Sequence, residues 1–365
     1  MTGRPLAPSL PVGIRDLHEA RERIHEDVVY TPCPRAAAFN DLSDGKLYLK
    51  FESLQCTGSF KDRGSLNRML NLTEEERRRG VVTASAGNHA QAVAYHASRL
   101  GIPCTVVMPE GAPLIKVMNT RGYGAHVILH GLVLDDSAEE AWRLVHEEGR
   151  VMIHPFDDPL VSAGRGTMGM EIAEQAPEVA LVVAPIGGGG KISGIALALT
   201  AHRPSEKIVG VEVEAAPSAR ASRDAGEIVK ITSNRTIADG IATKRVGQHT
   251  FPIIESLVDD IVVVSEEETA QAILMLLERQ KAVVEGAGAV GLAALVSGRV
   301  DLGQGQRGVL LISGGNIDIN RVARIIDRGL VFDGRLVRLK VRVPDRPGNL
   351  ASLTRLVAGL GANVL

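Results

Sequence analysis

The sequence has few cysteines, few aromatic residues and no excess of either charge. Its three cysteines, Cys33, Cys56 and Cys104, are an odd number without metal-ligand spacing, which argues against a disulfide framework or a zinc site. Aromatic residues make up 3% of the chain, and 41 basic residues stand against 43 acidic ones. This balance gives no support for a nucleic-acid partner, which would require a basic surface and stacking side chains.

Long apolar runs are also missing. None approaches the roughly 18 residues that cross a bilayer, so no membrane-spanning segment is expected. Residues 1–11 hold three prolines and Arg4 without an apolar centre, a pattern that predicts a loose tail rather than a signal peptide. Together with the unpaired cysteines, these features predict a cytoplasmic protein without a membrane partner.

Apolar runs typical of strands alternate with helical patterns along the 365 residues. This order predicts an α/β fold of doubly wound, mainly parallel sheets. The expected strands are residues 81–84, 105–108, 126–129, 181–184, 208–213, 260–264 and 309–312.

Two glycine-rich strand-to-helix turns lie about a hundred residues apart, which predicts two sheets and a site between two domains. We expect a large domain of residues 1–53 and 155–328 and a small domain of residues 54–154. Beyond residue 330, a strand (336–343), a turn (345–349) and a helix (350–360) are expected. Residues 335–365 therefore read as an incomplete α+β module.

Lys61 has an unusual setting for a lysine. It follows Phe60 in the segment Thr57-Gly58-Ser59-Phe60-Lys61-Asp62-Arg63-Gly64, among small and polar residues. A lysine in such a place can lose its proton and form an imine with an aldehyde.

The glycine run Gly187, Gly188, Gly189 and Gly190 follows the strand at 181–184 and precedes a helical run at 192–199. Converging backbone N–H groups at a helix N-terminus bind phosphate, and this is the favoured interpretation over a flexible turn. The run is not a Walker loop, because Ile192 stands where that loop has serine or threonine.

The segment Ser85-Ala86-Gly87-Asn88-His89 occupies another strand-to-helix turn. Its hydroxyl, amide and N–H groups can bind a substrate carboxylate, or Ser85 or Asn88 can simply cap the helix. Residues 313–316, Ser-Gly-Gly-Asn, also follow a buried strand. Ser313 can donate a hydrogen bond to a ring nitrogen, or the segment can be an ordinary turn.

Residues 286–291 match the glycine fingerprint of dinucleotide sites, and residues 282–284 could form its strand. The fingerprint also needs an acidic residue at the end of the next strand, and the sequence has Ser313 to Asn316 there. A nicotinamide cofactor is therefore not expected, and Glu285 is interpreted as part of a polar pocket wall.

Together these segments resemble the fold type II family of pyridoxal-phosphate (PLP) enzymes, and within it the threonine dehydratases (threonine ammonia-lyases). The resemblance covers roughly residues 25–330. Besides the segments above, it rests on His154-Pro-Phe-Asp-Asp-Pro159, Thr236-Ile-Ala-Asp-Gly-Ile-Ala242 and Glu285-Gly-Ala-Gly-Ala289.

The resemblance implies PLP-dependent β-elimination of L-threonine or L-serine to a 2-oxo acid and ammonia. By it, Lys61 carries the cofactor as an imine and acts as the base, and Phe60 packs near the cofactor ring. Asn88 would bind the ring hydroxyl, Gly187 to Gly190 the phosphate and Ser313 the pyridine nitrogen. The substrate carboxylate would lie among Ser85, Asn88 and His89.

Similar enzymes also hold a monovalent or divalent cation, which implies a metal site near Glu212 and Ala216. Ser218 stands where relatives that bind divalent metal have an aspartate. Lys191 replaces the usual leucine after the glycines, so it either strengthens cofactor binding or is solvated. Asp62 replaces an isoleucine of dehydratases and occurs in related synthases.

Other enzymes of the family remain as alternatives: threonine synthase, serine racemase and hydroxyaspartate dehydratase. Ala86 replaces the serine that gives racemases their second acid/base group, so weak racemisation is expected. An idle amino-acid sensor is a further alternative. The tail, with Val343-Pro-Asp-Arg-Pro-Gly348, is similar to the start of an ACT domain, which implies an amino-acid effector. A homodimer or homotetramer is expected, and the resemblance leaves degradation or isoleucine biosynthesis open as the role.

Overall fold

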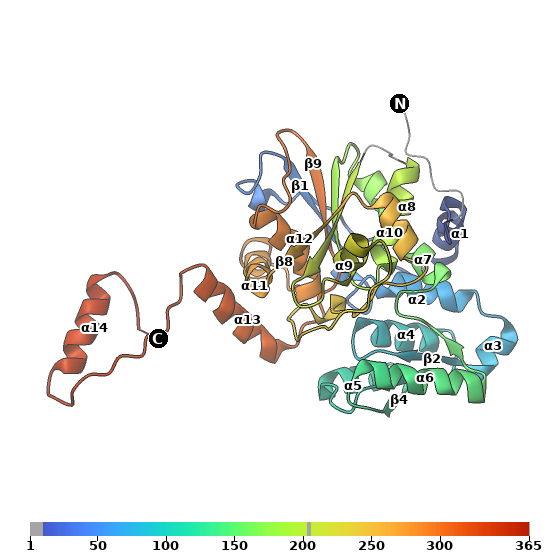
Figure 1. Ribbon diagram of the computed structural model, residues 1–365, viewed down its shortest axis with the longest axis horizontal. Helices are drawn as coiled ribbons and strands as arrows, with labels where there is room; N and C mark the ends of the chain where they lie inside the picture. Colours follow the sequence, from blue (N-terminus) through green and yellow to red (C-terminus); the bar gives the residue numbers. More distant parts are fainter. Residues whose placement is uncertain (1–9, 203–205, 365) are drawn as a thin grey trace.

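Two parallel β-sheets organise the computed structural model, which describes residues 10–202 and 206–364 (Figure 1). The larger sheet has the strand order β1-β9-β6-β7-β8, and the smaller has the order β4-β3-β2-β5. Seven of the nine strands predicted from the sequence form. The strands are β1 (Lys46–Phe51), β2 (Val81–Ala84), β3 (Cys104–Met108), β4 (His126–Leu129), β5 (Val151–Met152), β6 (Leu181–Pro185), β7 (Lys207–Val213), β8 (Asp260–Val264) and β9 (Arg307–Ile312).

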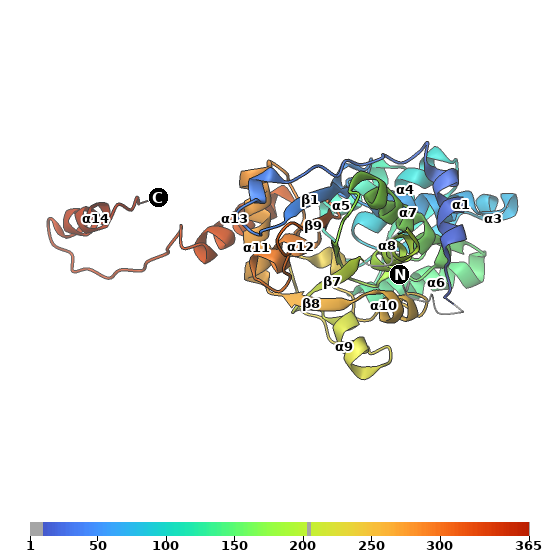
Figure 2. The ribbon, with the colours of Figure 1, turned by 90° about the horizontal axis from the view of Figure 1, so that it is seen from above.

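Helices cover both faces of the five-stranded sheet (Figure 2). Successive residues of a strand point to opposite faces, so Val182 and Ala184 enter one core and Leu181 and Val183 the other. The first core contains α1 (Ile14–Ile24), α7 (Pro159–Gln175), α8 (Gly190–His202) and α10 (Phe251–Leu257). The second contains α11 (Glu266–Met275) and α12 (Gly286–Val296), with α13 (Ile319–Phe332) packed on α11.

The four-stranded sheet also lies between helices. Its cores join the strands to α2 (Lys61–Leu70), α4 (Asn88–Arg99), α5 (Leu114–Gly122) and α6 (Leu134–Glu148). Shorter elements complete the fold: α3 (Glu74–Arg79), α9 (Ser218–Ala225), a π-helical turn (Leu276–Gln280) and the 3₁₀ turns Ala37–Phe39, Glu52–Leu54 and Asp239–Ile241.

Helix α7 begins with strong local signals. Asp158 caps it by accepting a hydrogen bond from the Val161 N–H, and Pro159 occupies its first turn. Close packing of α7 on α2 and α8 brings the three helices together. In this way α7 links the catalytic candidate Lys61 on α2 to the glycine turn at the start of α8.

Two expected strands do not form. Residues 282–284 are a loop after the π-helical turn, and Lys281 there has a φ of 59°. Residues 336–347 are also irregular, although the helix predicted in the tail is present as α14 (Asn349–Gly359). A strand needs a neighbour for its N–H and C=O groups, and the tail extends away from both sheets (Figure 1).

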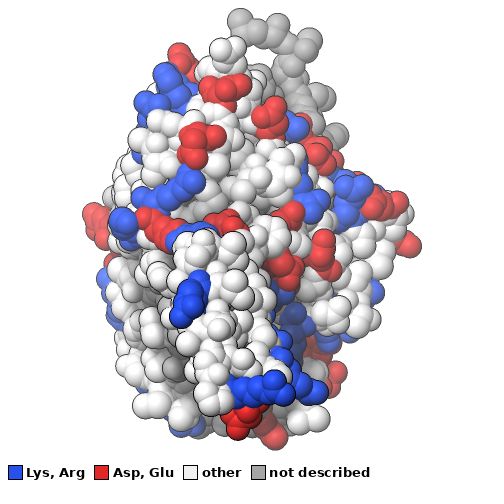
Figure 3. All heavy atoms as spheres, turned by 90° about the vertical axis from the view of Figure 1, so that its left-hand side faces the viewer, with Lys and Arg blue, Asp and Glu red and all other residues white. Residues whose placement is uncertain are grey.

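The surface shows no dominant charge on the face seen in Figure 3, where basic and acidic side chains lie interspersed. Among the described residues, no helix combines the length and the apolarity needed to cross a bilayer. Most of the tail predicted at residues 1–11 lies outside the described residues.

Candidate active site

A cavity of about 610 Å³ lies where the two sheets meet. Three of its walls come from turns at the carboxyl ends of strands, where ligands bind in open parallel sheets. Ser85 follows β2, Ser313 follows β9, and Lys191 comes after the glycine turn that follows β6. Lys61 and Phe60 line the same cavity, so the structure brings together residues that lie far apart in the sequence.

Lys61 is the first residue of α2, and its Nζ donates a hydrogen bond to the Pro155 carbonyl oxygen at 3.1 Å. Burial, and then the charges of Arg165 and Lys191, hold the pKa of the Lys61 ammonium well below its usual range. This shift favours the neutral amine, the state that a nucleophile or a base requires.

The glycine turn is closely packed, and side chains would not fit in it. Gly189 has a φ of 94°, and a Cβ there would lie 2.6 Å from the Thr250 Oγ1. A Cβ on Gly188 would lie 2.2 Å from the Phe156 ring, and one on Gly190 would lie 2.6 Å from the Phe156 carbonyl oxygen. Gly190 begins α8, so the turn presents the N-terminus of a helix, which favours an anion.

Three cationic side chains surround the Phe60 ring beside this turn. The distances to the ring centroid are 4.5 Å for Lys191 Nζ, 5.1 Å for Arg165 Cζ and 5.3 Å for Lys61 Nζ. The sequence did not indicate Arg165, because no motif marks a single arginine within a long helix. Lys191 is 5% exposed, so the alternative that it is solvated is wrong.

Asn88 joins the two lobes of the cavity through polar contacts. Its Nδ2 donates to both carboxylate oxygens of Glu285 at 2.8 and 2.9 Å, and its Oδ1 accepts from Asn316 Nδ2 at 2.9 Å. Burial raises the pKa of Glu285 to about 7. Glu285 thus forms part of the polar wall that the sequence predicted.

Ser313 is buried and lines the cavity near Phe60. Its hydroxyl lies 3.4 Å from the Ala287 carbonyl oxygen, and its own carbonyl oxygen accepts from the Phe60 N–H at 3.1 Å. A backbone bridge between Ser59 and Gly314 adds to this contact. The segment before Lys61 is therefore fixed to the turn after β9.

Ser85 and His89 lie at opposite sides of the β2–α4 turn. The Ser85 hydroxyl accepts from the Gly87 N–H at 3.2 Å at the cavity edge. The His89 ring instead contacts the Ile153 carbonyl oxygen at 2.9 Å and the Ser65 hydroxyl at 3.4 Å. The part of His89 that can meet a substrate carboxylate is therefore its backbone N–H at the start of α4.

Glu212 and Ala216 do not line the cavity. The Glu212 carboxylate accepts from the N–H groups of Ala219 and Arg220, each at 2.8 Å, and burial raises its pKa to about 7. Across residues 10–202 and 206–364, no group of three or more His, Cys, Asp or Glu residues could hold a metal ion. The cation site near Glu212 and Ala216 remains a prediction.

The residues of the cavity fit PLP. A partly buried amine with a lowered pKa is suited to an aldehyde, and a glycine turn at a helix N-terminus is suited to a phosphate. Lys191 Nζ and Arg165 Nε are buried without a hydrogen-bond partner within the described part of the chain, as expected where an anion binds.

A family model for pyridoxal-phosphate-dependent enzymes matches residues 24–314, and the chain belongs to this family. The fold is that of the fold type II PLP enzymes, as the sequence predicted, and PLP is the cofactor.

Two curated relatives share nearly half of their residues with this chain. The L-threonine ammonia-lyase of Thermotoga maritima is 48% identical over 97% of this chain and 88% of its own length. The catabolic L-threonine dehydratase TdcB of Escherichia coli K12 is 46% identical over 87% of this chain and 96% of its own length. Among solved structures, maize serine racemase matches with a TM-score of 0.83 and 36% identity, covering 89% of this chain and 99% of the racemase.

Proposed function

We propose that this protein is an L-threonine ammonia-lyase that also accepts L-serine. The observation that carries the proposal is Lys61, an amine with a lowered pKa, at a cavity that is also lined by Asn88, Ser313 and Lys191, the residue directly after the glycine turn. Two relatives with nearly half of the residues identical bear the names L-threonine ammonia-lyase and L-threonine dehydratase, which supports the same reaction here.

The cofactor would be held by residues of both lobes. Lys61 would bind its aldehyde carbon, Asn88 its ring hydroxyl and Ser313 its pyridine nitrogen, while Gly187 to Gly190 would hold its phosphate. PLP supplies an electron-withdrawing ring that acidifies the Cα–H bond of a bound amino acid.

The chain's own groups then move one proton and orient the substrate. Ser85, Asn88 and the His89 N–H bind the carboxylate, and the freed Lys61 amine takes the Cα proton. The β-hydroxyl leaves as water after protonation by a nearby acid. The released enamine takes up water and yields a 2-oxo acid and ammonia.

Ser313 favours elimination over reactions that need a long-lived carbanion. With PLP bound, the neutral Ser313 hydroxyl would leave the ring nitrogen largely unprotonated, whereas an aspartate would hold a proton there. Replacing Ser313 with Asp should therefore change the partition between elimination and other products.

The racemase alternative follows from the structural likeness to maize serine racemase. Ala86 lines the cavity but has no group that exchanges a proton, which disfavours two-sided proton transfer. A synthase would need a second nucleophile or a phosphorylated substrate. An idle sensor would not need the neutral amine that Lys61 provides.

Formation of 2-oxobutyrate from L-threonine and of pyruvate from L-serine by the purified holoenzyme tests the proposal directly. We expect both products, a visible imine absorbance, and little D-serine from L-serine. D-serine formation at a rate comparable to pyruvate formation would assign the protein to the racemases instead.

We further propose a cytoplasmic homodimer or homotetramer, with residues 54–154 as a small domain and residues 1–53 and 155–328 as a large one. The name of the E. coli relative supports a role in degradation over isoleucine biosynthesis. A monovalent or divalent cation near Glu212 and Ala216 and an amino-acid effector at residues 335–365 complete the proposal.

A further inference from the structure

Two buried cations beside the glycine turn, Lys191 and Arg165, lower the pKa of Lys61 but have no contact assigned to them in the reaction described above. Lys191 is 5% exposed and Arg165 is 1% exposed. Lys191 Nζ and Arg165 Nε lack hydrogen-bond partners within the described residues, although Arg165 Nη2 donates to the Pro155 carbonyl oxygen at 2.6 Å. Buried charged groups without partners are costly, so a ligand is expected to supply what the protein does not.

Charge around these two residues is strongly unbalanced. The Lys61 amine lies at the same Phe60 ring, and burial and then the charges of Arg165 and Lys191 lower its pKa. Glu285 acts on Lys191 from across the cavity, and burial keeps Glu285 itself partly protonated near pH 7. The local excess of positive charge therefore favours an anion with more than one negative charge.

The position of the pair shows which part of a ligand it would meet. Lys191 directly follows Gly190 in the first turn of α8, and Arg165 Nη1 lies 2.7 Å from where a Cβ of Gly190 would be. Both therefore lie beside the N–H groups of the glycine turn. The residues proposed for the substrate carboxylate, Ser85 and Asn88, come from the other lobe.

We infer that Lys191 and Arg165 complete the glycine turn as a side-chain site for a phosphate monoester dianion, the phosphate of the cofactor. The inference rests on the proposed function, because it takes PLP to be bound through Lys61. Two cations balance the two negative charges of the phosphate, and the helix N-terminus adds its N–H groups. Lys191 thereby determines how strongly the protein discriminates PLP from the unphosphorylated aldehyde, pyridoxal.

The test compares PLP with pyridoxal on apoenzyme prepared from the full chain. Binding of each aldehyde is followed by the imine absorbance of Lys61. In Lys191→Met, the PLP dissociation constant should rise by about 10- to 100-fold, the effect of one lost charge-assisted interaction. The constant for pyridoxal should change by less than about twofold, because pyridoxal has no phosphate to lose.

Two further variants test the second cation and provide a control. Arg165→Gln should reduce the preference for PLP over pyridoxal in the same direction. Lys116→Met is the matched control, since Lys116 lines the same cavity but pairs with Asp239 at 3.1 Å. It should leave the preference unchanged. In the unmodified chain, inorganic phosphate should compete with PLP, and this competition should weaken in Lys191→Met.

Other outcomes would overturn the inference, and each identifies a different cause. Equal weakening of PLP and pyridoxal would mean that Lys191 acts on Lys61 rather than on a phosphate. If Lys191→Met weakened only the binding of a dicarboxylic substrate such as hydroxyaspartate, and not that of PLP, the pair would be assigned to a second substrate carboxylate. If the unmodified chain forms no imine with PLP, the proposed function fails. An unmodified chain that binds PLP, together with an unchanged preference in Lys191→Met, refutes the inference alone.

Discussion

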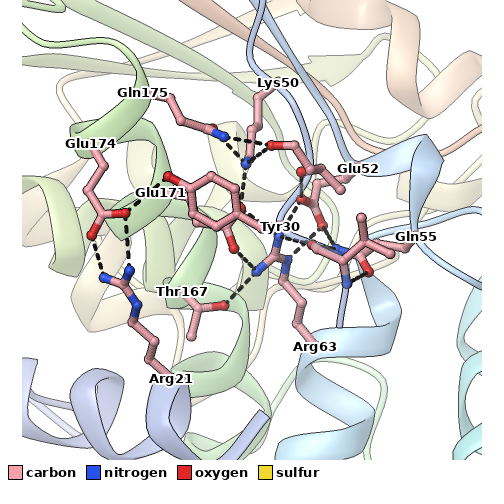
Figure 4. Close-up of polar contacts among 12 residues, drawn as sticks. Arg21, Tyr30, Lys50, Glu52, Gln55, Arg63, Thr167, Glu171, Glu174 and Gln175 are labelled. Carbon is pink, nitrogen blue, oxygen red and sulfur yellow. Dashed lines mark hydrogen bonds and ion pairs between the residues drawn. The ribbon is translucent and has the colours of Figure 1, made fainter. Parts of the chain in front are cut away.

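Two clusters of charged and basic groups each include a residue from the first turn of helix α2, and they differ in how their charges are balanced. Around Arg63 (Figure 4), the two cations Arg63 and Lys50 meet the two carboxylates Glu52 and Glu171. Arg63 contacts Glu52 at 2.8 Å and Glu171 at 2.6 Å. Around Phe60, by contrast, three basic groups, Lys61, Arg165 and Lys191, come together without an equal number of acids.

The two clusters therefore have different roles, one structural and one functional, although both include residues of α2. The Arg63 cluster joins α2 to β1 and α7, and its balanced charges fix the helix in place. The cluster around Phe60 lowers the pKa of Lys61 and offers positive charge to a ligand. Breaking the first cluster should therefore harm the fold, and breaking the second should harm binding and chemistry.

Replacing Lys61 with alanine should have the largest effect. We expect 2-oxobutyrate formation to fall by about 10³-fold or more, because both the amine that holds the cofactor and the base are lost. Stability should change little, since a buried amine with a low pKa contributes little to folding. Lys46→Ala, at the exposed start of β1, is the control for loss of a lysine. Activity within tenfold of the unmodified protein would remove Lys61 from the reaction.

Replacing Glu171 with glutamine should have the largest effect on stability. The change leaves Lys50 and Arg63 buried with one carboxylate fewer, at a cost of about 3 kcal/mol or more. Glu174→Gln on the same helix is the matched control, because its pair with Arg21 is partly exposed and contributes about 0–1 kcal/mol. Equal losses in urea unfolding of the two variants would mean that burial of the Arg63 cluster does not matter.

Replacing Lys191 with methionine should stabilise the apoprotein, whereas replacing Glu171 with glutamine should destabilise the protein. Removing an unpartnered buried cation is expected to stabilise the apoprotein by about 2 kcal/mol at pH 6. At saturating PLP this gain should be largely cancelled, because binding of the cofactor 10- to 100-fold more weakly stabilises the variant by about 1.4–2.7 kcal/mol less. Urea unfolding with and without PLP measures both. Destabilisation of the apoprotein would show that Lys191 has a structural partner.

Local sequence patterns marked the turns of the candidate site but not the two clusters around Arg63 and Phe60. Strand-to-helix turns with Gly187, Ser85 and Ser313 could be found because local patterns mark the carboxyl ends of strands. Strand β1 was missed because its lysines suggest exposure, yet Lys50 is fully buried and bonds to Glu171 of α7. Pairing across 121 positions leaves no local signal in a single sequence.

In the tail, by contrast, the sequence predicted a strand that does not form. Residues 336–343 have the apolar alternation of a strand, and the structure leaves them irregular. A strand pattern states what a segment can form when a neighbour is present, and pairing with that neighbour determines whether it does. The same reason applies to residues 282–284, which lie beside the cavity rather than in a sheet.

The smallest predicted effect is the pH dependence of the Lys191→Met comparison in the apoprotein. Burial lowers the pKa of Lys191 to about 7, below its value near 10.4 in an unfolded chain. Between these values the unfolded chain binds more protons, so the stability of the unmodified protein should rise with pH.

Urea unfolding gives the free energy of unfolding of Lys191→Met and of the unmodified protein. The difference between the two should be constant below about pH 6 and should fall by about 1 kcal/mol by pH 8. The groups that act on Lys191, namely Glu285, Arg165 and Glu52, are present in both proteins, and Glu285, whose pKa Lys191 lowers in turn, titrates in the same range. A difference that stays constant from pH 6 to pH 9 would mean that Lys191 keeps its proton as a paired lysine does. The charges around Phe60 would then be balanced, as they are in the Arg63 cluster.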